Sequence, residues 1–150
     1  MADLQKIKNA VMSGKRDEVS TLIQEALSAG DSPVTLLEGG MIPAMREIGD
    51  KFSRNEVYVP QMLIAARAMQ SGLALVEPAL AKTDHKPLGK VAIGTVKGDL
   101  HDIGKNLVAI MLKGAGYEVI DLGVNCDVNK YEEAFLQGAT VLACSALLTT

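Results

Sequence analysis

The sequence predicts an α/β chain in two parts, a four-helix N-terminal domain followed by a flavodoxin-like, Rossmann-type parallel-sheet domain. Apolar residues recur at three- and four-residue intervals through the first half, which is the period of an α-helix. The second half alternates short β-branched runs with helical stretches, which is typical of a parallel sheet. The polar segment at residues 82–87 (KTDHKP) lies between them and is predicted to be a linker. We therefore expect domains at residues 1–84 and 88–150.

Four helical stretches are expected in the first half. The second is the clearest, because its apolar residues repeat in the i, i+3, i+4, i+7 pattern of one helix face. Ser32 followed by Pro33 predicts the start of the third, with a capping side chain and a proline at the first helical position. The pair at 39–40 (Gly-Gly) and Pro43 are expected to kink or split that helix. The fourth begins near Pro60, and four short antiparallel helices would bury the apolar faces.

The second half is expected to form a β-α-β-α-β unit. Strands are predicted at 90–96, 117–122 and 139–146, and helices at 103–116 and 128–137. This alternation implies a parallel sheet with right-handed crossovers, and a flavodoxin-like order puts the third strand beside the first. Three strands leave one sheet edge open, so we expect either that the domain is truncated at the C-terminus or that a partner covers the edge.

Composition argues against several classes of function. The net charge is −3, there is no cluster of Lys and Arg, and aromatic residues make up 3% with no Trp, so a nucleic-acid partner is not expected. Neither a signal peptide nor an apolar run long enough to cross a bilayer is evident, so no membrane partner is expected. The spacing of Cys126 and Cys144 matches no zinc or redox motif, which favours free thiols and a cytoplasmic protein.

The loop after the first predicted strand carries the candidate chemistry. Residues 94–104 read GTVKGDLHDIG and leave the carboxyl end of that strand, where ligands bind in open α/β sheets. Ser145 ends the third strand and is expected at the same edge. Asp99 and His101 are two residues apart, so in an extended loop both can point the same way. Asp99 can then accept a hydrogen bond from one ring nitrogen and leave the other free to bind a metal.

The residues alone leave alternatives open. Gly104 would let a bulky group approach the backbone. A loop histidine such as His101 is, however, more often structural or merely exposed than functional. Phosphate binding is a second interpretation, although the loop matches neither a Walker A nor a G-x-G-x-x-G sequence. A metal hydrolase is a third, but closed metal sites need three or four ligands and the sequence does not indicate the others.

A resemblance to a known family narrows these alternatives. The D-x-H-x-x-G motif at Asp99, His101 and Gly104 resembles the cobalamin-binding domain of methionine synthase and of corrinoid proteins in methanol, methylamine and aryl-ether methyltransferase systems. The similarity continues through YEVIDLGVNC and CSALLTT. Residues 45–80 are similar to the helical cap module that precedes the cobalt domain in those proteins. The resemblance therefore covers nearly the whole chain.

The resemblance implies a corrinoid cofactor, cobalamin or a relative of it, which is methylcobalamin in the loaded state. The corrinoid's own lower base is detached, His101 replaces it on cobalt, and Asp99 hydrogen-bonds to His101. The detached tail would run along Ser145 and Leu147, which match the family's S-x-L positions. Related proteins continue beyond Thr150 with further strands that line the tail pocket. The cofactor contacts implied in this half are Gly98, Asp99, His101, Asp102, Ile103, Gly104, Ser145 and Leu147.

The helical half is expected to cover the upper face of the corrinoid. Tyr58, Met62, Ala66 and Met69 are predicted to share one face of the fourth helix and to form a lid, with Met62 and Ala66 contacting the cofactor. The alternative is that Met and Ala at helical spacing are core residues. The linker is the candidate hinge, and His85 within it is expected to be solvated.

The function implied is that of a methyl carrier, a corrinoid subunit of a methyltransferase system rather than a complete enzyme. It would shuttle a methyl group on cobalt between a substrate-specific methyltransferase and a folate- or thiol-methylating one, with a reductive activase as a further partner. A cobalamin-sensing regulatory module is the alternative, and the lack of a basic recognition helix argues against it. An adenosylcobalamin mutase domain and an α/β domain without cofactor are further alternatives.

Overall fold

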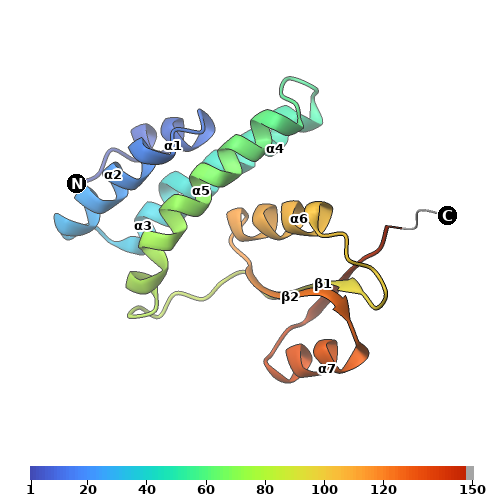
Figure 1. The fold of residues 1–150 in the computed structure, drawn as a ribbon. Helices are drawn as coiled ribbons and strands as arrows, with labels where there is room; N and C mark the ends of the chain where they lie inside the picture. The colour runs from blue at the N-terminus through green and yellow to red at the C-terminus, as the bar shows by residue number, and fades with distance from the viewer. Residues whose placement is uncertain (148–150) are drawn as a thin grey trace. The chain divides into compact units, whose positions relative to one another are not determined.

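The computed structural model describes residues 1–147, and the chain divides into two compact units, Met1–His85 and Lys86–Thr150 (Figure 1). The first unit is helical and the second is a parallel sheet with helices, so the predicted fold class is confirmed. Among the described residues, no helix is both long enough and apolar enough to span a bilayer.

The first unit contains four helical stretches, and the third of them changes its pitch instead of breaking. A Cβ added to Gly39 would lie 2.8 Å from Leu4 Cδ1, and one added to Gly40 would lie 3.2 Å from Ile7 Cγ2. The two glycines therefore let the first helix approach closely, and a π-helical turn joins the segments before and after them. The elements are α1 (Leu4–Met12), α2 (Arg16–Ser28), α3 (Pro33–Leu36), the π-helical turn η1 (Leu37–Met41), α4 (Ile42–Ser53) and α5 (Val59–Leu80).

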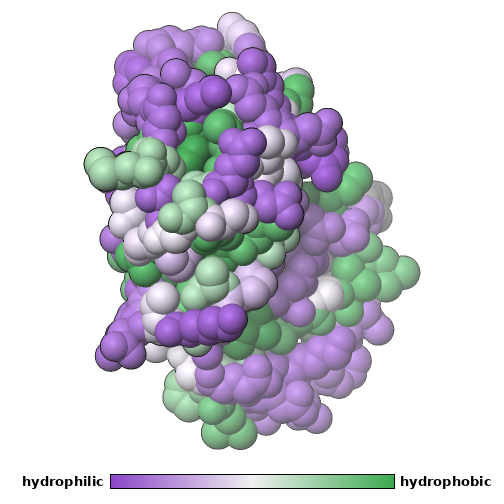
Figure 2. Space-filling model, turned by 90° about the vertical axis from the view of Figure 1, so that its left-hand side faces the viewer, coloured by the Kyte–Doolittle hydropathy of each residue, from purple (hydrophilic) through white to green (hydrophobic). Residues whose placement is uncertain are grey.

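The core of the helical unit is made of large side chains at helical spacing. Their burial removes apolar surface from water, which is the main force that holds such a unit together. In the space-filling view, hydrophilic residues cover much of the face drawn and hydrophobic residues show in smaller groups (Figure 2). The largest fully buried residues of this unit are Ile7, Val11, Val19, Ile23, Leu36, Met41, Met69 and Val76.

The second unit is a three-stranded parallel sheet in the order β2-β1-β3, as predicted. Its elements are β1 (Lys90–Val96), α6 (Ile103–Gly114), β2 (Glu118–Cys126), α7 (Val128–Leu136) and β3 (Val141–Ser145). The two helices cover opposite faces of the sheet (Figure 1). β1 is central and buried along most of its length, which explains why its sequence is a continuous apolar run.

The end of the sheet near the candidate loop is irregular. In the register of β1 and β3, Thr95 lies opposite Ser145, so these strands end side by side. Between β1 and β2, the register shifts at Gly94, and Val96 lies opposite Cys126. β2 therefore extends to Cys126, beyond the predicted strand at 117–122, because the register shifts accommodate additional residues in the ladder.

Candidate functional site

The candidate loop is tied to the end of the strand that it follows. Gly98 has φ +84°, in the left-handed region that favours glycine, and the Asp99 N–H donates to the carbonyl oxygen of Val96 at 3.1 Å. The hydroxyl of Thr95, which is fully buried, donates to the carbonyl oxygen of His101 at 2.8 Å. The loop therefore turns tightly over the end of β1 and returns close to it.

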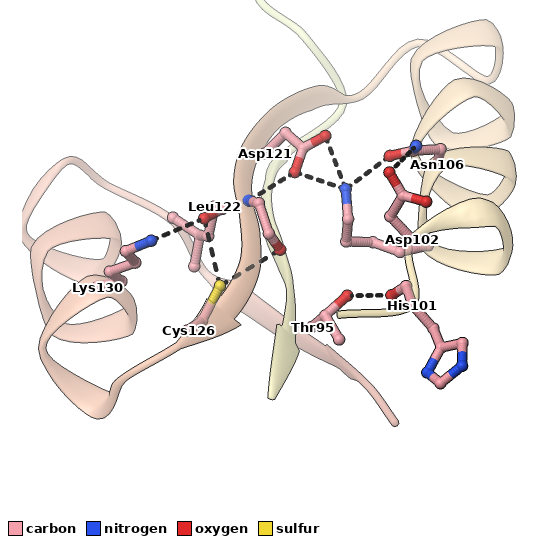
Figure 3. Close-up of polar contacts among 10 residues, drawn as sticks. Thr95, His101, Asp102, Asn106, Asp121, Leu122, Cys126 and Lys130 are labelled. Carbon is pink, nitrogen blue, oxygen red and sulfur yellow. Dashed lines mark hydrogen bonds and ion pairs between the residues drawn. The ribbon is translucent and has the colours of Figure 1, made fainter. Parts of the chain in front are cut away.

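Asp99 and His101 form a close pair in this loop. Asp99 Oδ1 accepts from the His101 N–H at 2.9 Å and lies 2.6 Å from His101 Nδ1. An ionised carboxylate only accepts, so Nδ1 carries a proton, and in the neutral imidazole Nε2 is the nitrogen with a free lone pair. The His101 side chain is 54% exposed, whereas that of Asp99 is 10% exposed. In Figure 3 the ring points away from the polar contacts that join the strands to α6.

Asp99 also connects this loop to the end of β3. Its second oxygen, Oδ2, accepts from the Leu147 N–H at 2.7 Å. The backbone N–H groups of His101 and Leu147, followed by the His101 ring, lower the pKa of Asp99 to about 2. The carboxylate is therefore ionised at neutral pH and able to hold the ring in a single tautomer.

The structure brings the β3 end to the loop, as the sequence suggests. Ser145 pairs with Thr95 across the strands, and Leu147 contacts Asp99 through its backbone. The remainder of the CSALLTT segment, residues 148–150, lies outside the described residues.

The His101 loop and the segment after β3 carry exposed apolar side chains. Leu100, Ile103 and Leu147 are 73%, 85% and 55% exposed. Gly104 follows Ile103 in the chain, and a Cβ added to Gly104 would meet no atom within 4 Å. The protein's own packing therefore leaves the space at Gly104 open.

Asp102 occupies the position before α6 but makes no capping hydrogen bond with its side chain. Its backbone (φ −130°, ψ −14°) is not in the extended conformation of a capping residue. The Asn106 N–H donates instead to the Asp102 carbonyl oxygen at 2.8 Å, and Asn106 Nδ2 donates to the Asp102 carboxylate at 3.3 Å.

A buried lysine supports the start of α6, and sequence reasoning missed it. Lys105 is 3% exposed, and its Nζ donates to both carboxylate oxygens of Asp121 at 2.8 and 2.9 Å and to Asn106 Oδ1 at 2.6 Å. Burial raises the pKa of Asp121, but Lys105 and the Gly123 N–H outweigh it and hold that pKa below its ordinary value. A signal was present, because Asp121 is a carboxylate set between the apolar residues Ile120 and Leu122 of a predicted strand, and it lies against Lys105 in the structure (Figure 3).

In the helical unit, the predicted lid residues do not share one exposed face. Met62 is 9% exposed, and Ala66 and Met69 are fully buried on α5. Tyr58 precedes α5 and is 66% exposed, so the prediction of a common face is wrong for it. The three buried residues match the alternative that they are core residues. A role for Met62 and Ala66 in contacting a cofactor stays a prediction.

His85 is not solvated as predicted. Its side chain is 14% exposed, and its Nδ1 lies 3.5 Å from Glu38 Oε1 of η1. This pair could not be predicted from the sequence, because Glu38 and His85 are far apart in the chain and only the tertiary structure brings them together.

Comparisons with known proteins agree across both units. Two family models, each described as a B12 binding domain, match residues 3–77 and 89–150. The trimethylamine corrinoid protein of Methanosarcina barkeri is 41% identical over 150 residues, which cover 98% of this chain and 69% of that protein. A corrinoid protein of Desulfitobacterium hafniense is 36% identical over 154 residues, covering 100% of this chain and 71% of the relative.

Solved structures show the same similarity. The methanol:cobalamin methyltransferase complex of Methanosarcina barkeri contains a chain with a TM-score of 0.86 and 28% identity, covering 97% of this chain and 57% of that one. The monomethylamine corrinoid protein of the same organism gives a TM-score of 0.58 and 32% identity, covering 97% of this chain and 70% of that one. This chain therefore spans a little over half to about two thirds of the length of the proteins that it resembles.

Proposed function

Because the chain belongs to the family of corrinoid proteins built from B12-binding domains, we propose that it carries a methyl group on the cobalt of its corrinoid between two methyltransferases. Its cofactor is a corrinoid, cobalamin or a close relative. The corrinoid supplies a cobalt that accepts and releases the methyl group, and the protein orients and tunes that metal.

The Asp99–His101 pair carries this proposal. The 2.6 Å contact from Nδ1 to Asp99 leaves Nε2 as the nitrogen available to cobalt, and the ring is half exposed. A carboxylate behind a metal-binding histidine fixes its tautomer and strengthens it as a ligand. We assign His101 as the lower ligand of cobalt and Asp99 as the residue that holds it.

The surroundings of His101 fit a large flat cofactor. Leu100 and Ile103 offer exposed apolar surface to the macrocycle, and the open space at Gly104 lets it approach the backbone. One imidazole would suffice as the protein's contribution, because a corrinoid would bring its other metal ligands with it. Ser145 and Leu147 lie where β3 ends beside this loop and are assigned to the cofactor's tail.

The proposed partners follow from the relatives. One similar chain is part of a methanol:cobalamin methyltransferase complex, and several relatives are named as methylamine corrinoid proteins. We assign a substrate-specific methyltransferase as the first partner, a folate- or thiol-methylating enzyme as the second, and a reductive activase as a third. The free thiols of Cys126 and Cys144 agree with a reducing compartment, and we place the carrier in the cytoplasm.

Anaerobic reconstitution tests the proposal. The protein is mixed with hydroxocobalamin and separated from unbound cofactor, and its visible spectrum is recorded. The loaded protein is then reduced and supplied with a methylamine methyltransferase and its amine. We expect bound corrinoid and the spectrum of a methylated cobalamin that appears only with enzyme and amine together. A protein that retains no corrinoid contradicts the family function, and a loaded protein that accepts no methyl group from methylamine or methanol systems contradicts the carrier role.

A further inference from the structure

Asn125 has an uncommon backbone conformation next to the His101 loop. It is the penultimate residue of β2, and its φ of 51° lies in the left-handed region. Among the non-glycine residues that the structure describes, Asn55 is the other with a positive φ. Asparagine tolerates this conformation better than most residues, so the identity of the side chain suits the backbone.

One backbone group and one side-chain group of Asn125 bind the loop. The Asn125 N–H donates to the Asp99 carbonyl oxygen at 2.9 Å, and Asn125 Oδ1 accepts from the Gly98 N–H at 2.8 Å. The two hydrogen bonds hold consecutive loop residues, one of them at a left-handed glycine. The ion pair between Lys97 and Asp127 at 3.1 Å spans the same gap, but both side chains are exposed, so it contributes little.

These contacts fix the main chain of the residue that holds the imidazole. Asp99 reaches His101 Nδ1 over 2.6 Å, and a shift of about an ångström in the Asp99 backbone would break that contact. The Asp99 carboxylate is anchored from β3 by the Leu147 N–H, whereas its backbone is anchored from β2 by Asn125. The loop is therefore clamped from both neighbours of β1.

We propose that Asn125 is a positioning residue that holds the His101 loop in the shape that presents the imidazole to cobalt. The inference rests on the proposed function, because it takes His101 as the cobalt ligand. Asn125 acts through Gly98 and Asp99 and does not itself reach the metal.

Three substitutions of Asn125 separate the effect of its left-handed backbone conformation from the effect of its side-chain acceptor. Asn125→Gly keeps the left-handed backbone and removes the acceptor, Asn125→Ala removes the acceptor and disfavours the backbone, and Asn125→Asp keeps both. In the cobalamin-loaded protein reduced to Co(II), nitrogen superhyperfine splitting in the EPR spectrum reports an axial imidazole. We expect the ratio of ligated to unligated cobalt to fall about tenfold in Asn125→Gly and further in Asn125→Ala, and to recover in Asn125→Asp.

A measurement on the cofactor-free protein gives a second readout. Hydrogen exchange of the Gly98 amide should accelerate about tenfold in Asn125→Gly and not in Asn125→Asp, because only the former loses the acceptor. Asn55→Gly is the matched control, since Asn55 has a similar φ of 59° in the helical unit, and it should change neither readout. Where Asn125→Ala fails to fold, the Gly and Asp variants decide.

The outcomes distinguish the two proposals. If the wild-type protein binds corrinoid without nitrogen ligation, the ligand role of His101 is wrong and the positioning role falls with it. If the wild-type protein is ligated and Asn125→Gly is ligated to the same extent, the role of Asn125 is overturned and the proposed function stands.

Discussion

The chain has two histidines, each beside a carboxylate, and the two pairs are built in opposite ways. In the α/β unit, His101 is 54% exposed and Asp99 10%, with 2.6 Å between Nδ1 and Oδ1. In the helical unit, His85 is 14% exposed and Glu38 59%, with 3.5 Å between Nδ1 and Oε1. A carboxylate neighbour alone therefore does not make a metal ligand. To bind a metal, a histidine needs a carboxylate that holds one ring nitrogen and an accessible second ring nitrogen. Of His85 and His101, His101 meets both conditions.

The largest expected effect tests this contrast directly. His101→Ala should abolish nitrogen ligation in the EPR spectrum of the cobalamin-loaded, reduced protein, because it removes the only imidazole of the loop. His85→Ala should leave the spectrum unchanged, since that ring is covered and turned to Glu38. Ligation that persists in His101→Ala and disappears in His85→Ala would reverse the assignment.

A lysine–carboxylate ion pair extends the comparison to stability. In Lys105–Asp121 the cation is covered, with side-chain exposures of 2% and 46%, so removing the carboxylate leaves a buried charge without its partner. We expect Asp121→Asn to lower the free energy of unfolding by about 2 kcal/mol, below the usual range for buried pairs because Asp121 is half exposed. Lys105→Met should cost less, about 1 kcal/mol or under, since water can solvate the remaining carboxylate.

Urea unfolding of the cofactor-free protein measures both changes. If Asp121→Asn and Lys105→Met lower the free energy of unfolding equally, burial of the Lys105 cation does not explain the cost of breaking the pair.

The sequence predicted the parts of this site that local pattern controls. The strand order and the position of the Asp99–His101 loop follow from the apolar periods and the glycines, and the structure has both. The partners of the loop could not be predicted in the same way. Leu147 contributes a backbone N–H, which every residue except proline possesses, and Asn125 depends on a register shift in β2. Lys105 looked like an ordinary surface lysine, because the sequence does not show which helix face meets Asp121.

The role of the mostly buried Asp99 carboxylate can be tested by replacing it with an amide of the same shape. Asp99→Asn retains one acceptor atom in place of two, so it cannot serve both His101 and Leu147. We expect the ratio of ligated to unligated cobalt to fall about tenfold. Glu38→Gln is the matched control and should not change this ratio. An unchanged ratio in Asp99→Asn would mean that the ring needs no charged partner to bind the metal.

The smallest expected effect is on the pH dependence of the cofactor-free protein. The pKa of Asp99 is about 2 in the folded state, below the value of roughly 3.9 for an unfolded chain. Its ionised form therefore stabilises the fold fully above about pH 4, and this contribution is lost as the pH falls from 4 toward 2. A carboxyl-carbon NMR titration should give a midpoint near 2 for Asp99. A midpoint near 4 would show that the N–H groups of His101 and Leu147 do not hold this carboxylate in solution, and the contrast with the open carboxylate of Glu38 would lose its basis.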